Sequence, residues 1–363
     1  MMGNWKTCQL GDLITFQRGH DLPKSKMKGG IYPVVGSNGI IGYHDEYTTE
    51  SPSITIGRSG NVGKPFLYKG RSWSHNTSLY IREYKDIDPI FIYYFLQTLD
   101  LGNYAGGSAV PTLNRNHIHT LTVTVPVDKN EQRQIASVLS VLDDKIEQNT
   151  EINENLQEQA KAIYSKMIIE DADESWTPGV LSDIAIITMG QSPKGDTYNE
   201  DGVGTVFFQG RAEFGFRFPT RRLSTTDPKR MAQTNDALMS VRAPVGDMNV
   251  AYENCCIGRG LAAIRSKDDH QSFVLYTLFD LRDELNVFNS EGTVFGSINR
   301  DALNSMPISI PPRRVMDEFE VIVSPIDAAI RNNYDEICRL EAIRDNILPR
   351  LMSGELEVSD LDL

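Results

Sequence analysis

The sequence predicts an α+β fold in which two repeated α/β globules are each followed by a long helix. Three observations lead to this prediction. Short segments of the first half recur in the same order in the second half, and each half ends in a stretch with the heptad pattern of a coiled coil. The chain has 363 residues, about twice the size of an ordinary domain, so two hydrophobic cores are expected.

The repeat is carried by short matching segments. Each copy opens with the pattern Trp-x4-Leu-x-Asp, once at Trp5 and once at Trp176. The later matches, in chain order, are 56–63 with 240–246, 91–94 with 273–276, 112–115 with 297–300, and 123–126 with 308–311. Because the order is kept and the offset drifts only slowly, the chain contains an internal duplication.

Each half has the residue pattern of a mixed α/β globule. Alternating or β-branched runs predict strands at 31–35, 53–56, 78–82, 121–125, 205–208, 237–241, 261–264 and 306–310. Helical spacing is expected around 89–99 and 271–285. Stretches rich in Gly, Asn and Ser, such as 36–42 and 102–107, predict turns or loops.

Each globule is followed by a stretch whose apolar residues alternate four and three positions apart. The first stripe is Ile135, Leu139, Leu142, Ile146, Asn149, Asn153, Leu156, Ala160, Ile163 and Met167. The second is Phe319, Val323, Ile326, Ile330, Asn333, Ile337, Leu340, Arg344, Ile347 and Leu351. This is the a/d pattern of a coiled coil. A helix packed only on its own globule is the alternative, but it explains neither the length of the stripes nor the matching asparagines.

These patterns give five predicted segments. The globules are expected at 1–128 and 171–312, the long helices at 129–170 and 313–353, and an acidic tail at 354–363.

The composition limits the classes of protein to consider. No run of about eighteen apolar residues exists, so no membrane span is expected. The four cysteines, Cys8, Cys255, Cys256 and Cys338, have no metal-ligand spacing, which favours a reducing, cytoplasmic location. The formal net charge of −13 disfavours nucleic-acid binding by the chain as a whole. Cations are nevertheless concentrated locally between Arg211 and Arg230.

The residues needed for catalysis are missing from the sequence. The only Pro-Pro pair, at 311–312, ends a predicted strand and is not the loop of an amino-methyltransferase. The stretch 57–65 resembles a phosphate-binding loop, but Pro65 stands where Ser or Thr would bind magnesium. His117 and His119 have no nearby Cys or carboxylate pair to complete a metal site. We therefore expect no catalytic residue, no metal and no cofactor in this chain.

Polar loops that carry cations are the candidate DNA-reading elements. Arginine can bind guanine and asparagine can bind adenine in the major groove, while lysine and backbone amides bind phosphates. The candidates are Arg58, Ser59, Asn61, Lys64, Arg71 and Asn76 in the first half, and Arg211, Arg217, Arg221, Arg222, Arg242 and Arg259 in the second. For any one of them, an ion-paired surface role is the alternative.

Along its whole length the chain resembles the specificity subunits of type I restriction–modification systems. The resemblance rests on the two Trp-x4-Leu-x-Asp openings, on the long helices, and on two local segments. Residues 131–136 (EQRQIA) open the first helix, and residues 344–355 (RDNILPRLMSGE) close the second. The start of the second helix departs from the family pattern, because residues 314–319 (RVMDEF) lack its acidic-Gln opening.

The resemblance implies a division of labour. Each globule would be a target-recognition domain that reads one half of a bipartite, asymmetric site in double-stranded DNA, and the helices would form an antiparallel coiled coil that sets the spacing. Two modification (methyltransferase) subunits, using S-adenosylmethionine, and restriction (translocase/nuclease) subunits, using ATP and magnesium, would be the partners. The alternatives are the specificity module of a related multi-subunit methylation or defence system, and a non-enzymatic tandem-domain scaffold.

An antiparallel coil predicts a register for the asparagines of the two stripes. Asn149 and Asn333 are equivalent by the repeat, and matching the helices about their midpoints places Asn153 opposite Asn333 and Asn149 opposite Ile337. The fit is poor only where Leu142 meets Arg344. Because a buried polar layer penalises slipped registers, we expect the three asparagines to cluster and to fix the half-site spacing.

Overall fold

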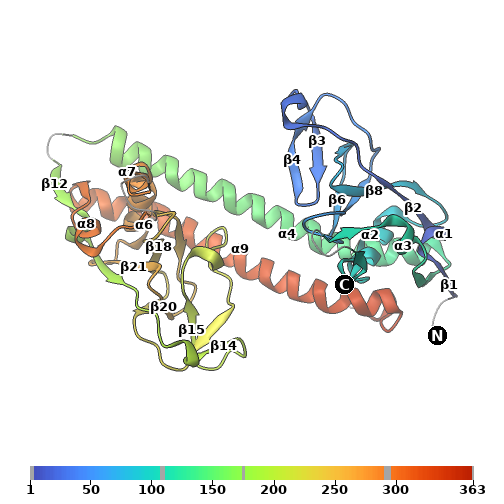
Figure 1. Cartoon of the computed structure of the whole chain (residues 1–363). Coiled ribbons are helices and arrows are strands. Elements are labelled where there is room, and N and C mark those ends of the chain that lie inside the picture. Colours follow the sequence, from blue (N-terminus) through green and yellow to red (C-terminus); the bar gives the residue numbers. More distant parts are fainter. Residues whose placement is uncertain (1–3, 107–110, 174–175, 290–295, 362–363) are drawn as a thin grey trace. The chain divides into compact units, whose positions relative to one another are not determined.

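The computed structural model describes residues 4–106, 111–173, 176–289 and 296–361 (Figure 1). The chain separates into two compact units. Unit 1 comprises Met1–Asn149 with Asp335–Leu363, and unit 2 comprises Thr150–Tyr334. Each unit therefore contains one globule and parts of both long helices, so the predicted linear limits between globule and helix stay predictions. Gly107, at the end of one predicted loop, and the last two residues of the predicted tail lie outside the described residues.

Unit 1 is built on a sheet in the order β2-β8-β5-β6, flanked by the pair β1-β11 and by a smaller sheet, β4-β3-β7. Its strands are β1 (Trp5–Gln9), β2 (Ile14–Arg18), β3 (Tyr32–Gly36), β4 (Gly39–His44), β5 (Ser53–Gly57), β6 (Pro65–Tyr68), β7 (Trp73–Ser74), β8 (Ser78–Tyr84), β9 (Ala105–Gly106), β10 (Thr112–Leu113) and β11 (Thr122–Pro126). Its short helices are α1 (Leu10–Leu13), η1 (Lys24–Lys26), α2 (Pro89–Gln97), η2 (Leu101–Tyr104), α3 (Arg115–His119) and η6 (Val358–Asp360).

Unit 2 repeats this plan with the sheet β13-β21-β18-β19 and the pair β12-β22, and has the larger sheet β14-β16-β15-β20-β17 in place of β4-β3-β7. Its strands are β12 (Thr177–Val180), β13 (Ala185–Met189), β14 (Tyr198–Asn199), β15 (Thr205–Phe208), β16 (Leu223–Thr225), β17 (Met231–Ala232), β18 (Ala237–Ser240), β19 (Met248–Val250), β20 (Cys255–Ile257), β21 (Leu261–Ser266) and β22 (Pro307–Ile310). Its short helices are α5 (Leu181–Ile184), η4 (Gly195–Thr197), η5 (Arg211–Glu213), α6 (Gln271–Asp280), α7 (Arg282–Val287) and α8 (Arg300–Asn304).

The structure gives a physical reason for the opening motif of each repeat. The Asp12 carboxylate accepts a hydrogen bond from the Gln9 amide at 3.0 Å, and Asp183 accepts one from Val180 at 2.8 Å. Each aspartate thereby caps the single helical turn that follows the first strand. The leucine of the motif is fully buried in both copies.

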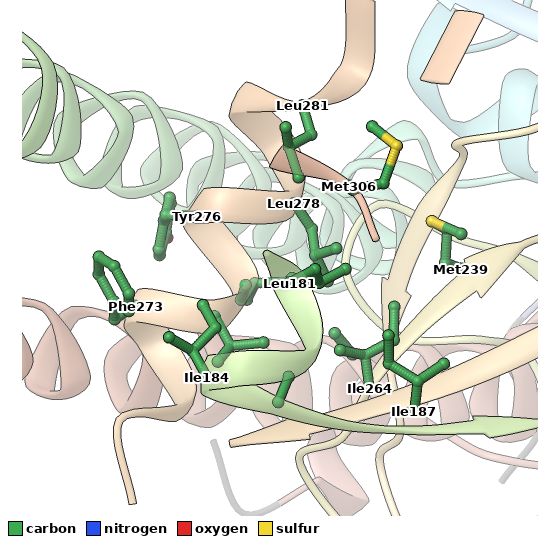
Figure 2. Close-up of a cluster of buried hydrophobic side chains, with 14 of the residues drawn as sticks. Leu181, Ile184, Ile187, Met239, Ile264, Phe273, Tyr276, Leu278, Leu281 and Met306 are labelled. Carbon is green, nitrogen blue, oxygen red and sulfur yellow. The ribbon is translucent and has the colours of Figure 1, made fainter. Parts of the chain in front are cut away.

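The hydrophobic core of unit 2 lies between its sheet and α6. Figure 2 shows Leu181 and Ile184 of α5 beside Phe273, Tyr276 and other apolar side chains. Strands β13, β18 and β21 contribute further buried side chains to the same cluster. The equivalent elements of unit 1 form a core of their own.

The two long helices are α4 (Lys129–Tyr164), which continues as a π-helical turn, η3 (Ser165–Glu170), and α9 (Arg313–Ser353). In unit 1, Ile135 and Leu139 of α4 share a core with Leu351 near the end of α9. In unit 2, Tyr164 near the end of α4 shares a core with Phe319 near the start of α9. The helices are thus antiparallel within each unit. No helix in the described part of the chain is both long and apolar enough to cross a membrane.

The predicted strands and short helices are all present, but both predicted loops contain regular structure. The described part of 102–107 forms most of η2 and the strand β9. Residues 36–42 were expected to be a turn or loop, but β3 and β4 form a hairpin in which Gly36 pairs with Gly39. The turn itself is only two residues long, and Gly39 has a φ of +95°. Glycine adopts such angles without strain, so a Gly-rich stretch can be a tight hairpin instead of an open loop.

Candidate nucleic-acid interface

In unit 1 the turn between β5 and β6 carries four of the predicted DNA-binding residues, Arg58, Ser59, Asn61 and Lys64. The turn is tight, because a Cβ added to Gly57 would lie 1.7 Å from the Asn61 carbonyl oxygen. The Arg58 carbonyl accepts a hydrogen bond from the Leu113 amide at 2.8 Å. This bond ties the turn to the segment that leads into α3.

Around Arg58 the structure forms an open groove of about 840 Å³, called the basic groove below. It is lined by Gln17, Arg18, Arg58, Leu79, Arg82, Gly106, Thr112, Leu113, Asn114, Arg115 and His117. The lining contains four arginines and, among the described residues, no carboxylate. Arg18 forms an exposed ion pair with Asp21 at 3.5 Å, which contributes little in water. The groove therefore offers several cations to an anionic ligand.

His119, beside the basic groove, is held in a structural role. Its Nε2 accepts a hydrogen bond from the Phe16 amide at 2.9 Å, so that nitrogen carries no proton. Burial lowers the pKa of His119, and the charges of Arg115 and Lys85 lower it further. His119 is therefore a neutral imidazole, and its hydrogen bond connects α3 to β2. The described residues contain no group of three or more His, Cys, Asp or Glu side chains that could hold a metal ion.

Unit 2 repeats the local geometry of the Arg58 turn. The Val241 carbonyl accepts a hydrogen bond from the Ile298 amide at 3.1 Å, as the Arg58 carbonyl does from Leu113, so Val241 occupies the position of Arg58. Arg242 comes one residue later, at the position of Ser59, and forms a β-bridge with Ser297 as Ser59 does with Thr112. Asn299 caps α8 by accepting a hydrogen bond from Ala302 at 2.9 Å, and the exposed Arg300 follows it. In unit 1, Asn114 caps α3 in the same way and is followed by an arginine. Each unit thus has an arginine beside an Asn-Arg helix start, half-buried in unit 1 and exposed in unit 2.

Three other predicted residues remain, and two of them are next to these sites in the backbone. Thr77, which follows Asn76, accepts a hydrogen bond from the Arg58 amide at 2.8 Å, and Gly260, which follows Arg259, accepts one from the Val241 amide at 2.9 Å. Arg71 is ion-paired with Glu50 at 2.8 Å and lies over the Tyr47 ring, and Asn76 donates to Asp21. Neither residue lines the basic groove. Arg259 is exposed, and its backbone amide donates to Ser192 at 3.2 Å.

The arginines of segment 211–230 are mostly ion-paired within unit 2. The pairs are Arg211 with Asp247, Arg221 with Glu253, Arg222 with Glu213, and Lys229 with Asp227. Because Asp247, Glu253 and the Arg217 partner Asp327 lie outside the segment, a count of its charges misses the three acids that pair with it from elsewhere in unit 2.

Arg217 is corrected by the structure. Its side chain is only 4% exposed, and its guanidinium is paired with Asp327 of α9 and bonded to Gln157 of α4 at 3.2 Å. It also lies over the ring of Tyr276. A guanidinium enclosed in this way has no free surface to offer to a phosphate, so Arg217 is not a candidate DNA contact. It is a structural residue that joins the globule of unit 2 to its helices.

The asparagines of the two helices have specific partners. In unit 2, Asn333 donates to Asn153 Oδ1 at 2.9 Å, and Asn153 donates to the Ile330 carbonyl at 3.2 Å. In unit 1, Asn149 is 1% exposed and donates to Glu336 at 2.8 Å. The Asn153–Asn333 pair is the one expected from the antiparallel register. The grouping of all three asparagines, and their control of spacing, stay predictions.

Sequence reasoning missed three arginines of the basic groove: Arg18, Arg82 and Arg115. Arg18 and Arg82 lie on β2 and β8, which pair with each other, so only the sheet register brings them together. A sequence signal existed for Arg115, because the pair Asn114-Arg115 recurs as Asn299-Arg300.

Comparisons with known proteins agree with this repeated architecture. Residues 2–158 and 173–339 each match the model of the type I restriction modification DNA specificity domain. The chain is 31% identical to the putative type I restriction enzyme MjaX specificity subunit of Methanocaldococcus jannaschii over 330 residues, covering 84% of this chain and 77% of that protein. It is 23% identical to the MjaIX specificity subunit of the same organism, covering 75% and 70%.

A solved structure supports the fold alone. The crystal structure of a type I restriction–modification system S subunit from M. genitalium superposes with a TM-score of 0.65 at 17% sequence identity. The match covers 96% of both chains.

Proposed function

Because the chain belongs to the type I restriction–modification DNA specificity family, we propose that it reads a bipartite, asymmetric DNA site. Each globule would read one half-site, and the antiparallel helices would set the distance between the halves. The chain would act as a non-catalytic subunit, supplying sequence recognition to partners that carry out the chemistry.

The observation that carries this proposal is the site repeated in both units. In each, an arginine with at least part of its surface in solvent lies in the turn after a core strand, one residue beyond β5 in unit 1 and two residues beyond β18 in unit 2, beside an Asn-Arg pair that begins a short helix. Arginine binds guanine or phosphate through several donors held in one plane, which suits DNA better than a neutral ligand. In unit 1 the basic groove surrounds this arginine with further cations.

We propose double-stranded DNA, two modification (methyltransferase) subunits and restriction subunits as the partners. S-adenosylmethionine, ATP and magnesium would then be bound by those partners and not by this chain. A cytoplasmic location is proposed as well. It is supported by the free cysteines in the described residues, of which Cys255 is buried, with a pKa raised by that burial to about 12.

Methylome sequencing tests the proposal most directly. Cells would express the chain together with the modification genes that neighbour its own gene. We expect a methylated motif with two unlike halves at a fixed spacing. Arg58→Ala should weaken or relax one half only, and Arg242→Ala the other half only.

The matched control is Arg314→Ala, which removes an exposed arginine of α9 that pairs with Glu318 one helical turn away. This variant should leave both halves of the motif unchanged. If Arg58→Ala changed both halves equally, or if no motif depended on this chain, the two globules would not be independent DNA readers.

A further inference from the structure

Each globule is fastened to the long helix that follows it by an equivalent tyrosine. The Tyr94 hydroxyl of α2 donates to Asp143 of α4 at 2.7 Å, and the Tyr276 hydroxyl of α6 donates to Asp327 of α9 at 3.0 Å. Tyr94 and Tyr276 are equivalent in the repeat, and Asp143 and Asp327 are separated along the chain as Asn149 and Asn333 are. Because both units make this contact, it cannot determine which globule packs on which long helix.

At the N-terminal ends of the same two helices, the charges are reversed between the units. In unit 1 the residue that caps α2 is acidic. It is Asp88, and its carboxylate lies 3.7 Å from the guanidinium of Arg133 on α4. In unit 2 the N-cap of α6 is His270, whose Nε2 lies 2.7 Å from Asp317 of α9. Asp88 and His270 each precede their tyrosine by the same number of residues, and Arg133 and Asp317 each precede their aspartate by the same number.

The carboxylate that accepts hydrogen bonds from the first amides of α2 or α6 also comes from a different element in each unit. In unit 1, Asp88 itself accepts hydrogen bonds from the amides of Ile90 and Phe91, both at 3.0 Å. In unit 2 the first amides of α6, at Ser272 and Phe273, donate instead to Glu320 of α9 at 3.1 and 3.2 Å.

The residue of α4 equivalent to Glu320 is Ala136, which cannot cap a helix. A helix N-terminus needs an acceptor for its free amides, and each unit supplies that acceptor from a different element.

From these contacts we infer that the reversed charges match each globule to its own long helix, so that α2 docks correctly only on α4 and α6 only on α9. If α2 docked on α9, Asp88 would face both Asp317 and Glu320. If α6 docked on α4, His270 would face Arg133 and its first amides would lack a cap. Asp88, His270 and their partners are thus positioning residues that keep two similar globules in a fixed order.

The contact in unit 2 contains a histidine, so its strength also depends on pH. His270 faces Asp317 and Asp268, with Arg313 3.9 Å from Asp317. Burial by itself lowers the pKa of His270, but the hydrogen bonds to Asp317 and Asp268 raise it more, so the net shift is upward. A raised pKa in the folded state means that the protonated histidine stabilises unit 2 at low pH, and that this stabilisation is lost as pH rises through that pKa.

The experiment transplants the contact of unit 1 into unit 2 of the full chain and follows amide hydrogen exchange of α6. Asp317→Arg alone should speed that exchange about tenfold, because it replaces an attractive pair by a repulsive one. The triple variant His270→Asp, Asp317→Arg, Glu320→Ala rebuilds the acidic N-cap and the basic partner of unit 1. It should restore exchange to within about threefold of the parent and abolish the histidine-linked pH dependence of unit 2 stability.

Two further variants keep the test decisive. Arg314→Asp, which changes an exposed neighbour on α9, should leave α6 exchange unchanged. If Asp317→Arg unfolds unit 2, the mirror series in unit 1 (Arg133→Asp alone, then with Asp88→His and Ala136→Glu) measures the same rescue on α2. The inference would be overturned if amide exchange in the triple variants were as fast as the summed effects of the single substitutions predict. No DNA is present in these measurements, so their failure would leave the proposed DNA-reading function untouched.

Discussion

The basic groove of unit 1 and the segment 211–230 of unit 2 both contain several arginines, yet their surroundings differ. In the groove, arginines from separate stretches of the chain come together and no described carboxylate lines the site. In the segment, Arg211, Arg221 and Arg222 each face an acid, and Arg217 is buried against Asp327. Cations close in sequence are therefore not the same as a cationic surface, because the acids that neutralise them can come from other elements.

The largest effect that separates the two regions should come from Arg217→Ala. Removing one partner of a buried ion pair leaves Asp327 without its cation and costs about 3–5 kcal/mol. We expect the free energy of unfolding of unit 2 to fall by roughly this amount, measured by denaturant-dependent hydrogen exchange. Arg221→Ala, which removes an exposed paired arginine, should change it by less than about 0.5 kcal/mol. Equal decreases for the two variants would contradict the structural role of Arg217.

A second effect concerns DNA affinity through the basic groove. The triple variant Arg58→Ala, Arg82→Ala, Arg115→Ala should bind double-stranded DNA about 100-fold more weakly at physiological salt, since an arginine that binds a base is worth about 1–3 kcal/mol at best. The slope of log affinity against log salt should also flatten, by about one unit for each phosphate that the variant no longer binds. Fluorescence anisotropy over a salt series measures both quantities. An unchanged slope would show that the groove does not bind the DNA backbone.

A smaller effect is expected from the paired arginines of unit 2. From the sequence alone, replacing Arg211, Arg217, Arg221 and Arg222 should weaken DNA binding substantially. With Arg217 left intact, we expect Arg211→Ala, Arg221→Ala, Arg222→Ala to lower affinity less than about threefold, because each side chain already has an anionic partner. The same anisotropy series tests it. A decrease as large as that of the groove variant would show that these pairs open on DNA.

A modest change in stability should accompany Asn153→Leu, Asn333→Leu. Replacing a buried polar pair by apolar side chains changes the unfolding free energy by no more than about 2 kcal/mol and can even stabilise the coil. The register should nevertheless loosen, giving methylated motifs of mixed spacing in place of one spacing. Asn155→Leu, Asn332→Leu, at exposed positions of the same helices, is the matched control. A single unchanged spacing in the Asn153, Asn333 variant would remove the asparagines from any role in spacing.

Much of the fold could be predicted because it depends on local and periodic patterns. The heptad stripes indicated both long helices, and the repeated Trp-x4-Leu-x-Asp motif marked both globules. The Asp12 and Asp183 caps show why that motif is short and recognisable in the sequence. The capping carboxylate and the amide that donates to it are only three residues apart. The candidate site was less predictable. Arg58 and Arg242 were found from loop composition, but Arg82 was not, because it is one residue of an ordinary strand.

The sequence by itself determined the duplication, the helices and the pairing of Asn153 with Asn333, because each follows from periodicity along one chain. Only the tertiary structure decided which arginines are free and which are neutralised, because ion pairs such as Arg217–Asp327 join residues far apart in sequence. The same holds for the reversed charges at Asp88 and His270, whose partners lie on the long helices. A charge acts through whatever lies within a few ångströms of it, and folding, not sequence order, selects those neighbours.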